Sequence, residues 1–410
     1  MTEQTRLTRT RRTRASCTLS DVQTTPNDVR PPWNPYSKPF RAPHESEYLE
    51  QVLSSGHTHG DGPFTERASA QLTGITGSDS VLLTGSGTHA LELASWLLEL
   101  EPGDEVIVPS FTFSTTAASV VMTGATPVFV DIDPATGSLD IDAAEAALTG
   151  RTRAVYVVHY GGVAPNMNRL AAMAERSGIQ IVEDNAHGLG ARWGGRSCGS
   201  FGVLAAQSFH ATKNVQCGEG GALLINNPSL RRRAEVLREK GTDRSRFLRG
   251  EVDKYSWIDR GSSYLPSELT VAVLTAQLEA FDIIQTQRHA IWDKYAGSLS
   301  TWAASTGMQL MSPPKEVEHP AHVFYLLAPD ADSRTGMLDH LRAAGVGATF
   351  HYIPLHSSIA GQRFGRTPNP CPATDDFAAR IVRLPLWPGM TDAETDRVIT
   401  AARAFEPALV

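Results

Sequence analysis

Asp184 and Lys213 are residues whose side chains could act together in catalysis. Lys213 lies in the run Gln207–Asn214, shortly before the glycine-rich Gly218–Gly221. A lysine amine can form a Schiff base with an aldehyde cofactor. Asp184 ends an apolar run, where a carboxylate can hold a pyridinium nitrogen. Together they predict pyridoxal 5'-phosphate (PLP) as cofactor, although a lone lysine is more often a surface group and a strand-end aspartate more often a cap or turn residue.

The composition of the 410-residue chain is that of a soluble globular protein, with 41% hydrophobic and 20% charged residues. The net charge of −7 does not favour nucleic-acid binding. No stretch approaches the roughly 20 apolar residues of a membrane span. The four cysteines (Cys17, Cys198, Cys217 and Cys371) are scattered, so neither a zinc site nor a disulfide framework is expected. These features predict a cytoplasmic location and no metal.

The N-terminal segment differs from the rest of the chain. Five arginines crowd a Thr-rich stretch that has almost no apolar residues: Arg6, Arg9, Arg11, Arg12 and Arg14. The pair Arg11-Arg12 is not followed by the apolar region of a twin-arginine signal. Residues 1–32 are therefore expected to form a disordered basic tail.

From residue 80 onward, short apolar runs alternate with helical patterns. Strands are expected at 81–83, 105–108, 127–130, 154–159 and 179–183, with helices at 88–100, 113–124, 141–148 and 168–177. Continuous apolar strands joined by helices indicate an α/β fold with a mostly parallel sheet covered by helices. Such sheets bind ligands at the carboxyl ends of their strands. Gly85, Ser110, His159 and Asp184 fall at those ends.

The second half of the chain has a different pattern. A strand at 222–225 precedes a charged helix at 228–240, an Arg-rich loop at 241–257 and helices between 266 and 301. A final α+β region follows, with a strand at 322–327, a helix at 333–344 and a strand at 348–353. The predicted organisation is a large cofactor-binding domain with an N-terminal substrate segment (33–300) and a smaller C-terminal domain (301–410).

Five ordered motifs carry a resemblance to a known family. They are Gly85–Leu91, Pro109–Phe113, Glu183–His187, Ser208–Asn214 and Gly218–Gly221. The chain resembles the DegT/DnrJ/EryC1/StrS sugar-nucleotide aminotransferases, which depend on PLP and have the aspartate-aminotransferase fold (PLP fold type I). Four further segments are similar to the branch that forms dTDP-4-amino-4,6-dideoxygalactose: Leu237–Ser245, Val252–Trp257, Gly261–Leu265 and Phe350–His356.

The resemblance implies roles around the cofactor ring. Lys213 would form the Schiff base and, once an amino donor displaces it, would move the proton between the substrate and cofactor carbons. Asp184 would keep the pyridine nitrogen protonated. His187, where relatives often carry glutamine, would donate a hydrogen bond to the phenolic oxygen, unless it is a packing histidine. Phe113 would stack on the ring.

The cofactor phosphate has its own expected residues. Ser86, Gly87 and Thr88 open a helix directly after a strand, where backbone N–H groups and the helix dipole favour an anion, although a simple Thr-capped turn would look the same. Ser208 matches the phosphate-binding hydroxyl of the family. Ser263 lies where many relatives carry an asparagine that reaches the partner subunit's cofactor. The resemblance therefore implies a homodimer with a shared active site.

Candidate substrate residues lie in two regions. A basic loop could meet the diphosphate of a nucleotide sugar, or could simply be solvated; it contains Lys240, Arg244, Arg246, Arg249 and Lys254. His351, Tyr352 and His356 are expected on the substrate side of the site, and His159 is expected near the sugar.

The resemblance implies transamination of a dTDP-4-keto-6-deoxyhexose at C4. L-Glutamate would be the donor, and the products would be a dTDP-4-amino-4,6-dideoxyhexose and 2-oxoglutarate. Lys213 argues against a sugar 3-dehydratase, because those relatives carry histidine there. An aminotransferase acting at C3 or on a keto-cyclitol, and a non-catalytic PLP-binding sensory protein, remain alternatives. The configuration at C4 of the product is left open.

Overall fold

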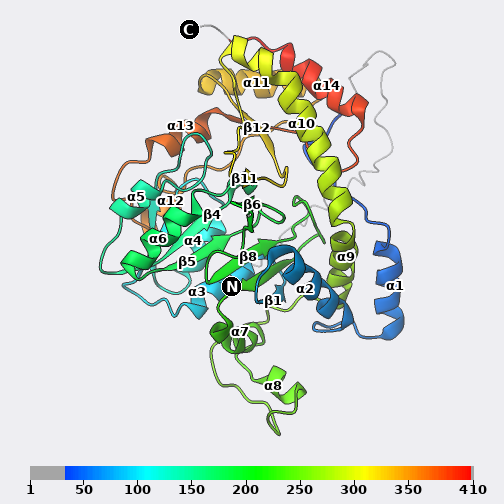
Figure 1. The fold of residues 1–410 in the computed structure, drawn as a ribbon, viewed down its shortest axis with the longest axis vertical. Coiled ribbons are helices and arrows are strands. Elements are labelled where there is room, and N and C mark those ends of the chain that lie inside the picture. The colour runs from blue at the N-terminus through cyan, green and yellow to red at the C-terminus, as the bar shows by residue number, and fades with distance from the viewer. Residues whose placement is uncertain (1–32, 408–410) are drawn as a thin grey trace, which may run out of the picture. The chain divides into compact units, whose positions relative to one another are not determined.

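The computed structural model describes residues 33–407, so the basic tail predicted for residues 1–32 lies outside the described residues. Its centre is a seven-stranded sheet of order β1-β9-β8-β5-β4-β2-β3 (Figure 1). The strands are β1 (Ser80–Thr84), β2 (Glu105–Pro109), β3 (Thr126–Val130), β4 (Thr152–Val158), β5 (Gln180–Asp184), β8 (Leu204–Ser208) and β9 (Gly221–Ile225).

The direction of the strands brings several predicted site residues to one edge of the large sheet. Only β9 runs antiparallel to its neighbours β1 and β8, and the other pairs in this sheet are parallel. The carboxyl ends of β1, β8 and β5 therefore share an edge. Asp184 ends β5, and Thr84 and Ser208 both pair with Gly221 at this edge. This topology is the mostly parallel, helix-covered sheet that the sequence predicts.

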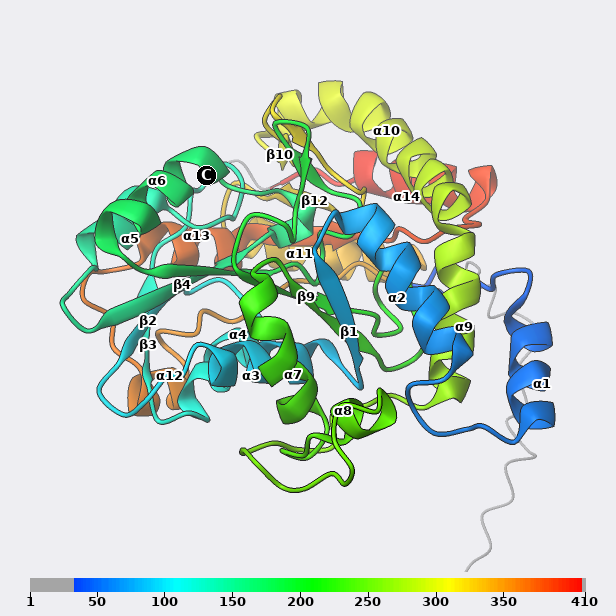
Figure 2. The same ribbon diagram turned by 60° about the horizontal axis from the view of Figure 1, so that its bottom comes forward.

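Alternate strand residues face opposite layers of helices, because side-chain direction has a period of two along a strand. Leu82, Val182 and Leu223 pack in one core with helices α3, α4 and α7. Neighbouring residues such as Leu83 and Ile181 belong to cores on the other side. Figure 2 shows helices on both faces of the large sheet. The helices of these layers are α1 (Glu45–Ser55), α2 (Pro63–Thr76), α3 (Gly87–Leu97), α4 (Ser114–Val121), α5 (Ile141–Ala146), α6 (Met167–Ser177), α7 (Arg231–Arg238) and α9 (Glu268–Glu279).

A second, antiparallel sheet of order β10-β12-β13 lies in the C-terminal part. Its strands are β10 (Gln309–Leu310), β12 (Phe324–Leu327) and β13 (Ile381–Leu384), and its helices are α11 (Ala331–Ala343), α13 (Pro372–Arg380) and α14 (Asp392–Arg403). Helix α10 (Phe281–Thr306) belongs to both parts, since Ile284 packs with the large sheet and Tyr295 with the small one. The proposed boundary at residue 300 therefore falls inside a helix, and the division into 33–300 and 301–410 remains a proposal.

Short elements complete the described chain. They are β6 (Arg192–Trp193), β7 (Arg196–Ser197), β11 (Val317–Glu318), α8 (Arg244–Leu248), α12 (Ile359–Phe364) and the 3-10 turns η1 (Tyr160–Gly162) and η2 (Pro228–Leu230). Within residues 33–407, no helix is both long and apolar enough to cross a membrane.

The prediction of a strand at 348–353 was wrong. This stretch is irregular and makes only isolated bridges, such as Thr349 with Arg383. Tyr352 has a φ of 34°, which a strand does not allow. Within this stretch, His351 and Tyr352 line a cavity and do not pair in a strand. The Arg-rich stretch predicted as a loop also contains the short helix α8.

Candidate active site

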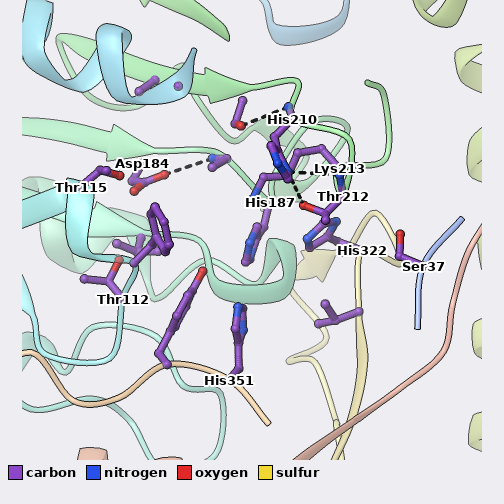
Figure 3. A pocket seen from close by; sticks show the side chains of 18 of the residues that line it. Ser37, Thr112, Thr115, Asp184, His187, His210, Thr212, Lys213, His322 and His351 are labelled. Carbon is purple, nitrogen blue, oxygen red and sulfur yellow. Dashed lines mark hydrogen bonds between the residues drawn. The ribbon is translucent and has the colours of Figure 1, made fainter. Parts of the chain in front are cut away.

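A cavity of about 610 Å³ opens at the carboxyl edge of the large sheet. Ten of the predicted site residues line it: Ser86, Gly87, Thr88, Phe113, Asp184, His187, Ser208, Lys213, His351 and Tyr352. They come from five separate stretches of the sequence, which the parallel strands bring together. Figure 3 shows several of these side chains, with His187 between Asp184 and Lys213 in this view.

Lys213 lies in the turn that follows β8. Its backbone N–H donates to the carbonyl of His210 at 2.8 Å. Burial lowers the pKa of its amine to about 8, with Asp184 acting in the opposite direction and Arg383 adding to the decrease. An amine with this pKa is partly neutral near neutral pH, which is the form that attacks an aldehyde.

Asp184 is held in one orientation by hydrogen bonds. Its Oδ2 accepts from the hydroxyl of Thr116 at 2.7 Å, and its Oδ1 accepts from the backbone N–H of Ala186 at 3.2 Å. Because the Thr116 proton is directed at Asp184, the hydroxyl of Thr112 must donate to Thr116, 2.8 Å away. This chain of donors fixes the orientation of the carboxylate, so that it can pair with a pyridinium.

His187 presents a defined ring nitrogen to the cavity. Its Nδ1 accepts the backbone N–H of Gly161 at 3.3 Å, so the neutral ring carries its proton on Nε2. Burial, followed by the charge of Lys213, lowers the pKa of His187 well below its usual value. The neutral ring can therefore donate from Nε2, as the predicted bond to a phenolic oxygen requires.

The predicted phosphate cradle is formed at the start of α3. The Oγ of Ser86 caps the helix by accepting the N–H of His89 at 3.1 Å, and the first-turn N–H groups lack partners within the helix. A Cβ on Gly87 would lie 2.9 Å from the Cβ of Ser208, and a Cβ on Gly221 would lie 2.3 Å from the backbone of Ser86. Glycine at position 87 lets the helix start approach the end of β8, and glycine at position 221 lets the start of β9 approach the backbone of Ser86.

Phe113 and the segment around Tyr352 form the aromatic part of the wall. Phe113 is 56% exposed although it lines the cavity, so one face of its ring is available for stacking. Tyr352 lies 6.3 Å from Phe113 between ring centroids and stacks on His351 at 3.6 Å. The hydroxyl of Tyr160 lies 2.9 Å from Nδ1 of His351. Burial raises the pKa of Tyr160 well above its usual value, so this hydroxyl stays protonated and donates.

The fit of these groups to PLP can be judged from the chain itself. A glycine-lined helix start suits the phosphate, an oriented carboxylate suits the ring nitrogen, and a buried amine of lowered pKa suits the aldehyde. The described residues contain no cluster of His, Cys, Asp or Glu that could hold a metal ion.

Several of the predicted site residues do not line this cavity, His356 and the basic residues of the loop after α7 among them. His159 is fully buried, and its Nε2 lies 2.8 Å from Glu183, which also accepts three backbone N–H groups of residues 199–202. The placement of His159 near the sugar was therefore wrong, since it holds a loop. Arg244 pairs with Glu239 and Arg246 with Glu251, and both lie on α8.

Ser263 is exposed and bridges the backbone of Glu239. It does not line the cavity of its own subunit. Its expected contact is with a partner subunit, so this role remains a prediction.

Several lining residues were not predicted, among them Tyr36, Arg288, His322 and Arg383. The ring of His322 lies 4.2 Å from that of His187 between centroids, tilted by 33°, and its Nδ1 lies 2.7 Å from Oδ1 of Asn214. Asn214 directly follows Lys213, yet nothing in the sequence links it to a histidine more than 100 positions later. Thr116 was likewise missed, because its partner Asp184 is a distant residue.

Comparison with known proteins decides the family. The sequence pattern of the DegT/DnrJ/EryC1/StrS aminotransferase family matches residues 41–403. The chain belongs to this family. It is a PLP-dependent aminotransferase with the type I fold, which confirms the predicted fold and cofactor.

Several solved aminotransferase structures are similar to this chain over nearly its whole length. DesV from S. venezuelae is 32% identical with a TM-score of 0.82, over 91% of this chain and 98% of that one. The aminotransferase TlmJ from Streptoalloteichus hindustanus is 30% identical with the same TM-score and the same shares covered. The putative sugar aminotransferase Spr1654 from Streptococcus pneumoniae is 26% identical with a TM-score of 0.84, over 90% of this chain and 98% of that one.

Proposed function

We propose that this aminotransferase transfers the amino group of L-glutamate to C4 of a dTDP-4-keto-6-deoxyhexose. The products are a dTDP-4-amino-4,6-dideoxyhexose and 2-oxoglutarate. The observation that carries the transamination step is the buried Lys213 amine, with a pKa lowered to about 8, in one cavity with the oriented Asp184 carboxylate.

The residues of the cavity would have different roles in the reaction. Bound PLP supplies an electron-withdrawing ring. Once the donor has displaced it, the Lys213 amine would move a proton between the donor's α-carbon and the cofactor carbon that had carried the aldehyde, for which a pKa near the working pH is well suited. Asp184 would keep the pyridine nitrogen of the cofactor protonated. His187 would donate a hydrogen bond from Nε2 to the cofactor's phenolic oxygen. Phe113 and Tyr352 line one side of the site.

The assignment of the sugar depends on the segment Phe350–His356. Its side chains His351 and Tyr352 line the cavity, so the segment that resembles the C4-aminating branch lies where a substrate would bind. His351 accepts from Tyr160 at Nδ1, which leaves Nε2–H as a donor for a sugar hydroxyl or the keto oxygen. Spr1654, described as a putative sugar aminotransferase, is a relative of matching length.

We also propose that the protein is a cytoplasmic homodimer whose subunits share the active site. Large apolar side chains are exposed between α7 and α9, with Trp257 at 80% and Leu248 at 62%. Exposed apolar residues on one segment are typical of an interface. Light scattering on the purified protein should give twice the chain's mass of 44.3 kDa. Trp257→Ser should shift it toward the monomer, whereas a monomeric parent would remove this part of the proposal.

The decisive experiment follows the cofactor absorbance. The holoenzyme should lose its Schiff-base absorbance band on addition of glutamate and regain it with the keto-sugar nucleotide. NMR coupling constants around C4 of the product would then establish the position and configuration of the new amine. Amination at C3, or turnover of a keto-cyclitol instead, would replace the sugar assignment. A protein that binds PLP but does not bleach with any amino acid would support the sensory alternative.

A further inference from the structure

A second cavity, of about 10 Å³, shares Lys213, His187 and His322 with the wall of the large one. Figure 3 shows these three side chains. A space of this size holds about one water-sized group, so it has room for the Lys213 amine once that amine is free. An amine there brings N–H donors and one lone pair, and a buried N–H without an acceptor is costly. The side chains around the small cavity therefore decide how a free amine is oriented.

The tautomer of His322 is set by Asn214. Nδ2 of Asn214 donates to the carbonyl of Pro320 at 2.7 Å and to Oε1 of Gln285 at 3.2 Å, so its Oδ1 is the end that faces His322. Nδ1 of His322 lies 2.7 Å from this oxygen and must carry the proton. Burial, followed by the charge of Lys213, lowers the pKa of His322 well below its usual value, so the ring is neutral. Its Nε2 is therefore a hydrogen-bond acceptor.

The other polar side chains around the small cavity already have partners. Oε1 of Gln207 accepts a side-chain N–H at 2.9 Å, and Oδ1 of Asn214 accepts from His322. Nδ1 of His187 accepts a backbone N–H, which leaves this ring a donor. Oγ of Ser208 accepts a backbone N–H at 3.4 Å and belongs to the predicted phosphate cradle. Within residues 33–407, Nε2 of His322 has no hydrogen-bond partner, so this acceptor is available to the amine.

The segment that carries His322 is held in an unfavourable conformation. Ala321 has a φ of 48°, in the left-handed region that residues with a Cβ rarely adopt. Arg288 donates to the carbonyls of Ala321 and His322, at 2.9 and 2.6 Å. Backbone strain of this kind persists only where surrounding contacts impose it, and it is typical of functional sites. The bend brings the ring of His322 to within 4.2 Å of the ring of His187 between centroids.

We propose that Nε2 of His322 accepts an N–H of the freed Lys213 amine, and that Asn214 keeps His322 in the tautomer that can do so. This inference rests on the proposed function, because it requires an amino donor to free the amine. With one N–H bound to His322, the lone pair of the amine is left to take the proton of the donor's α-carbon. His322 itself gains and loses no proton, so it is a positioning residue that acts through Lys213.

The first test compares two substitutions of His322 in the holoenzyme. His322→Phe keeps a ring but removes the acceptor, so bleaching by saturating glutamate should slow about 3- to 10-fold. The rate ratio between glutamate and α-deuterated glutamate should rise, because proton transfer then limits more of the rate. His322→Gln retains a side-chain oxygen acceptor and should recover most of both effects. His340→Phe is the matched control, because His340 bonds the carbonyl of Ala401 and lies outside the cavity lining.

The second test needs no cofactor. In cofactor-free protein labelled with ¹⁵N in the histidine rings, NMR should show His322 protonated at Nδ1 and bare at Nε2. His187 should show the opposite pattern. Each signal is assigned by its loss when that histidine is replaced by glutamine. Asn214→Ala should release Nδ1 of His322 and give a mixture of the two tautomers.

Several outcomes would overturn the inference. One is a proton on Nε2 of His322 in the parent protein. Others are equal bleaching rates in the parent and His322→Phe, or equal losses in His322→Phe and His322→Gln, which packing alone would explain. Should His322→Phe not fold, Asn214→Ala takes its place in the rate comparison and should slow bleaching with the ring still present. A parent that no amino acid bleaches would refute the proposed function, and this inference with it.

Discussion

The two sides of the cavity are built in different ways. On the cofactor side, Asp184 and Ser208 end strands of a hydrogen-bonded ladder, and α3 begins directly after another strand. On the substrate side, residues 349–356 have no ladder. They are held by individual bonds: Tyr160 to His351, Arg383 to Phe350, and Ser110 to both the ring and the backbone of His356.

The difference matches the demands on each side. Cofactor chemistry requires fixed positions, which rigid strands provide. Irregular segments tolerate sequence variation more readily than strands do, which suits residues proposed to contact the substrate. The positive φ of Tyr352 shows that its conformation is imposed by neighbouring contacts and not by local preference. Substitutions on the cofactor side should therefore affect both half-reactions, and those on the substrate side should affect only one.

Removal of the Lys213 amine should have the largest effect. Lys213→Ala should lower turnover by about 10,000-fold, because the proton-transferring group is lost, and the protein should no longer carry covalently reducible cofactor. Borohydride reduction followed by peptide mapping would check the second point. Lys315→Ala, at an exposed lysine, is the control. A tagged peptide that excludes position 213 would contradict the assignment.

Neutralising Asp184 should have the second-largest effect on turnover. Asp184→Asn keeps the shape but removes the charge, so turnover should fall by about 100- to 1,000-fold in both half-reactions. Thr116→Val removes only one hydrogen bond to this carboxylate and should cost about 10-fold. Single-turnover absorbance measurements would separate the half-reactions. An effect limited to the sugar half-reaction would show that Asp184 belongs to the substrate side.

The pH dependence of cofactor attachment tests the environment of Lys213. The neutral amine attacks the aldehyde, and its pKa is lowered to about 8. The attachment rate of the cofactor-free protein should therefore rise about tenfold per pH unit up to about pH 8 and then level off. Stopped-flow absorbance would follow this rate. A rise that continues toward pH 10.5, the ordinary value for lysine, would show that the amine is not buried.

The smallest effect is expected on the substrate side. Ser110→Ala removes the 2.7 Å contact with Nδ1 of His356 and should loosen the segment that carries His351 and Tyr352. The KM for the keto sugar should rise about 3- to 10-fold, while the glutamate half-reaction stays unchanged. Ser357→Ala, at an exposed neighbour, should change neither. A comparable loss in both half-reactions would show that the segment also supports the cofactor.

Local patterns in the sequence were enough for the alternation of strands and helices, and they pointed to candidate cofactor residues whose roles remain predictions. Each of these depends on a few consecutive positions, such as the glycine and hydroxyl residues between β1 and α3. The family resemblance then linked Lys213, Asp184 and Ser208 to one cofactor, and the structure places them around one cavity.

Only the tertiary structure decided which polar residues face that cavity. Glu183 and Asp184 are neighbours on β5, yet successive strand residues point to opposite faces. Asp184 therefore reaches the cavity, while Glu183 turns away and holds His159 in the interior. Thr116, His322 and Arg383 acquire their roles from partners far along the chain. Such long-range contacts depend on how layers pack, and no short stretch of sequence encodes them.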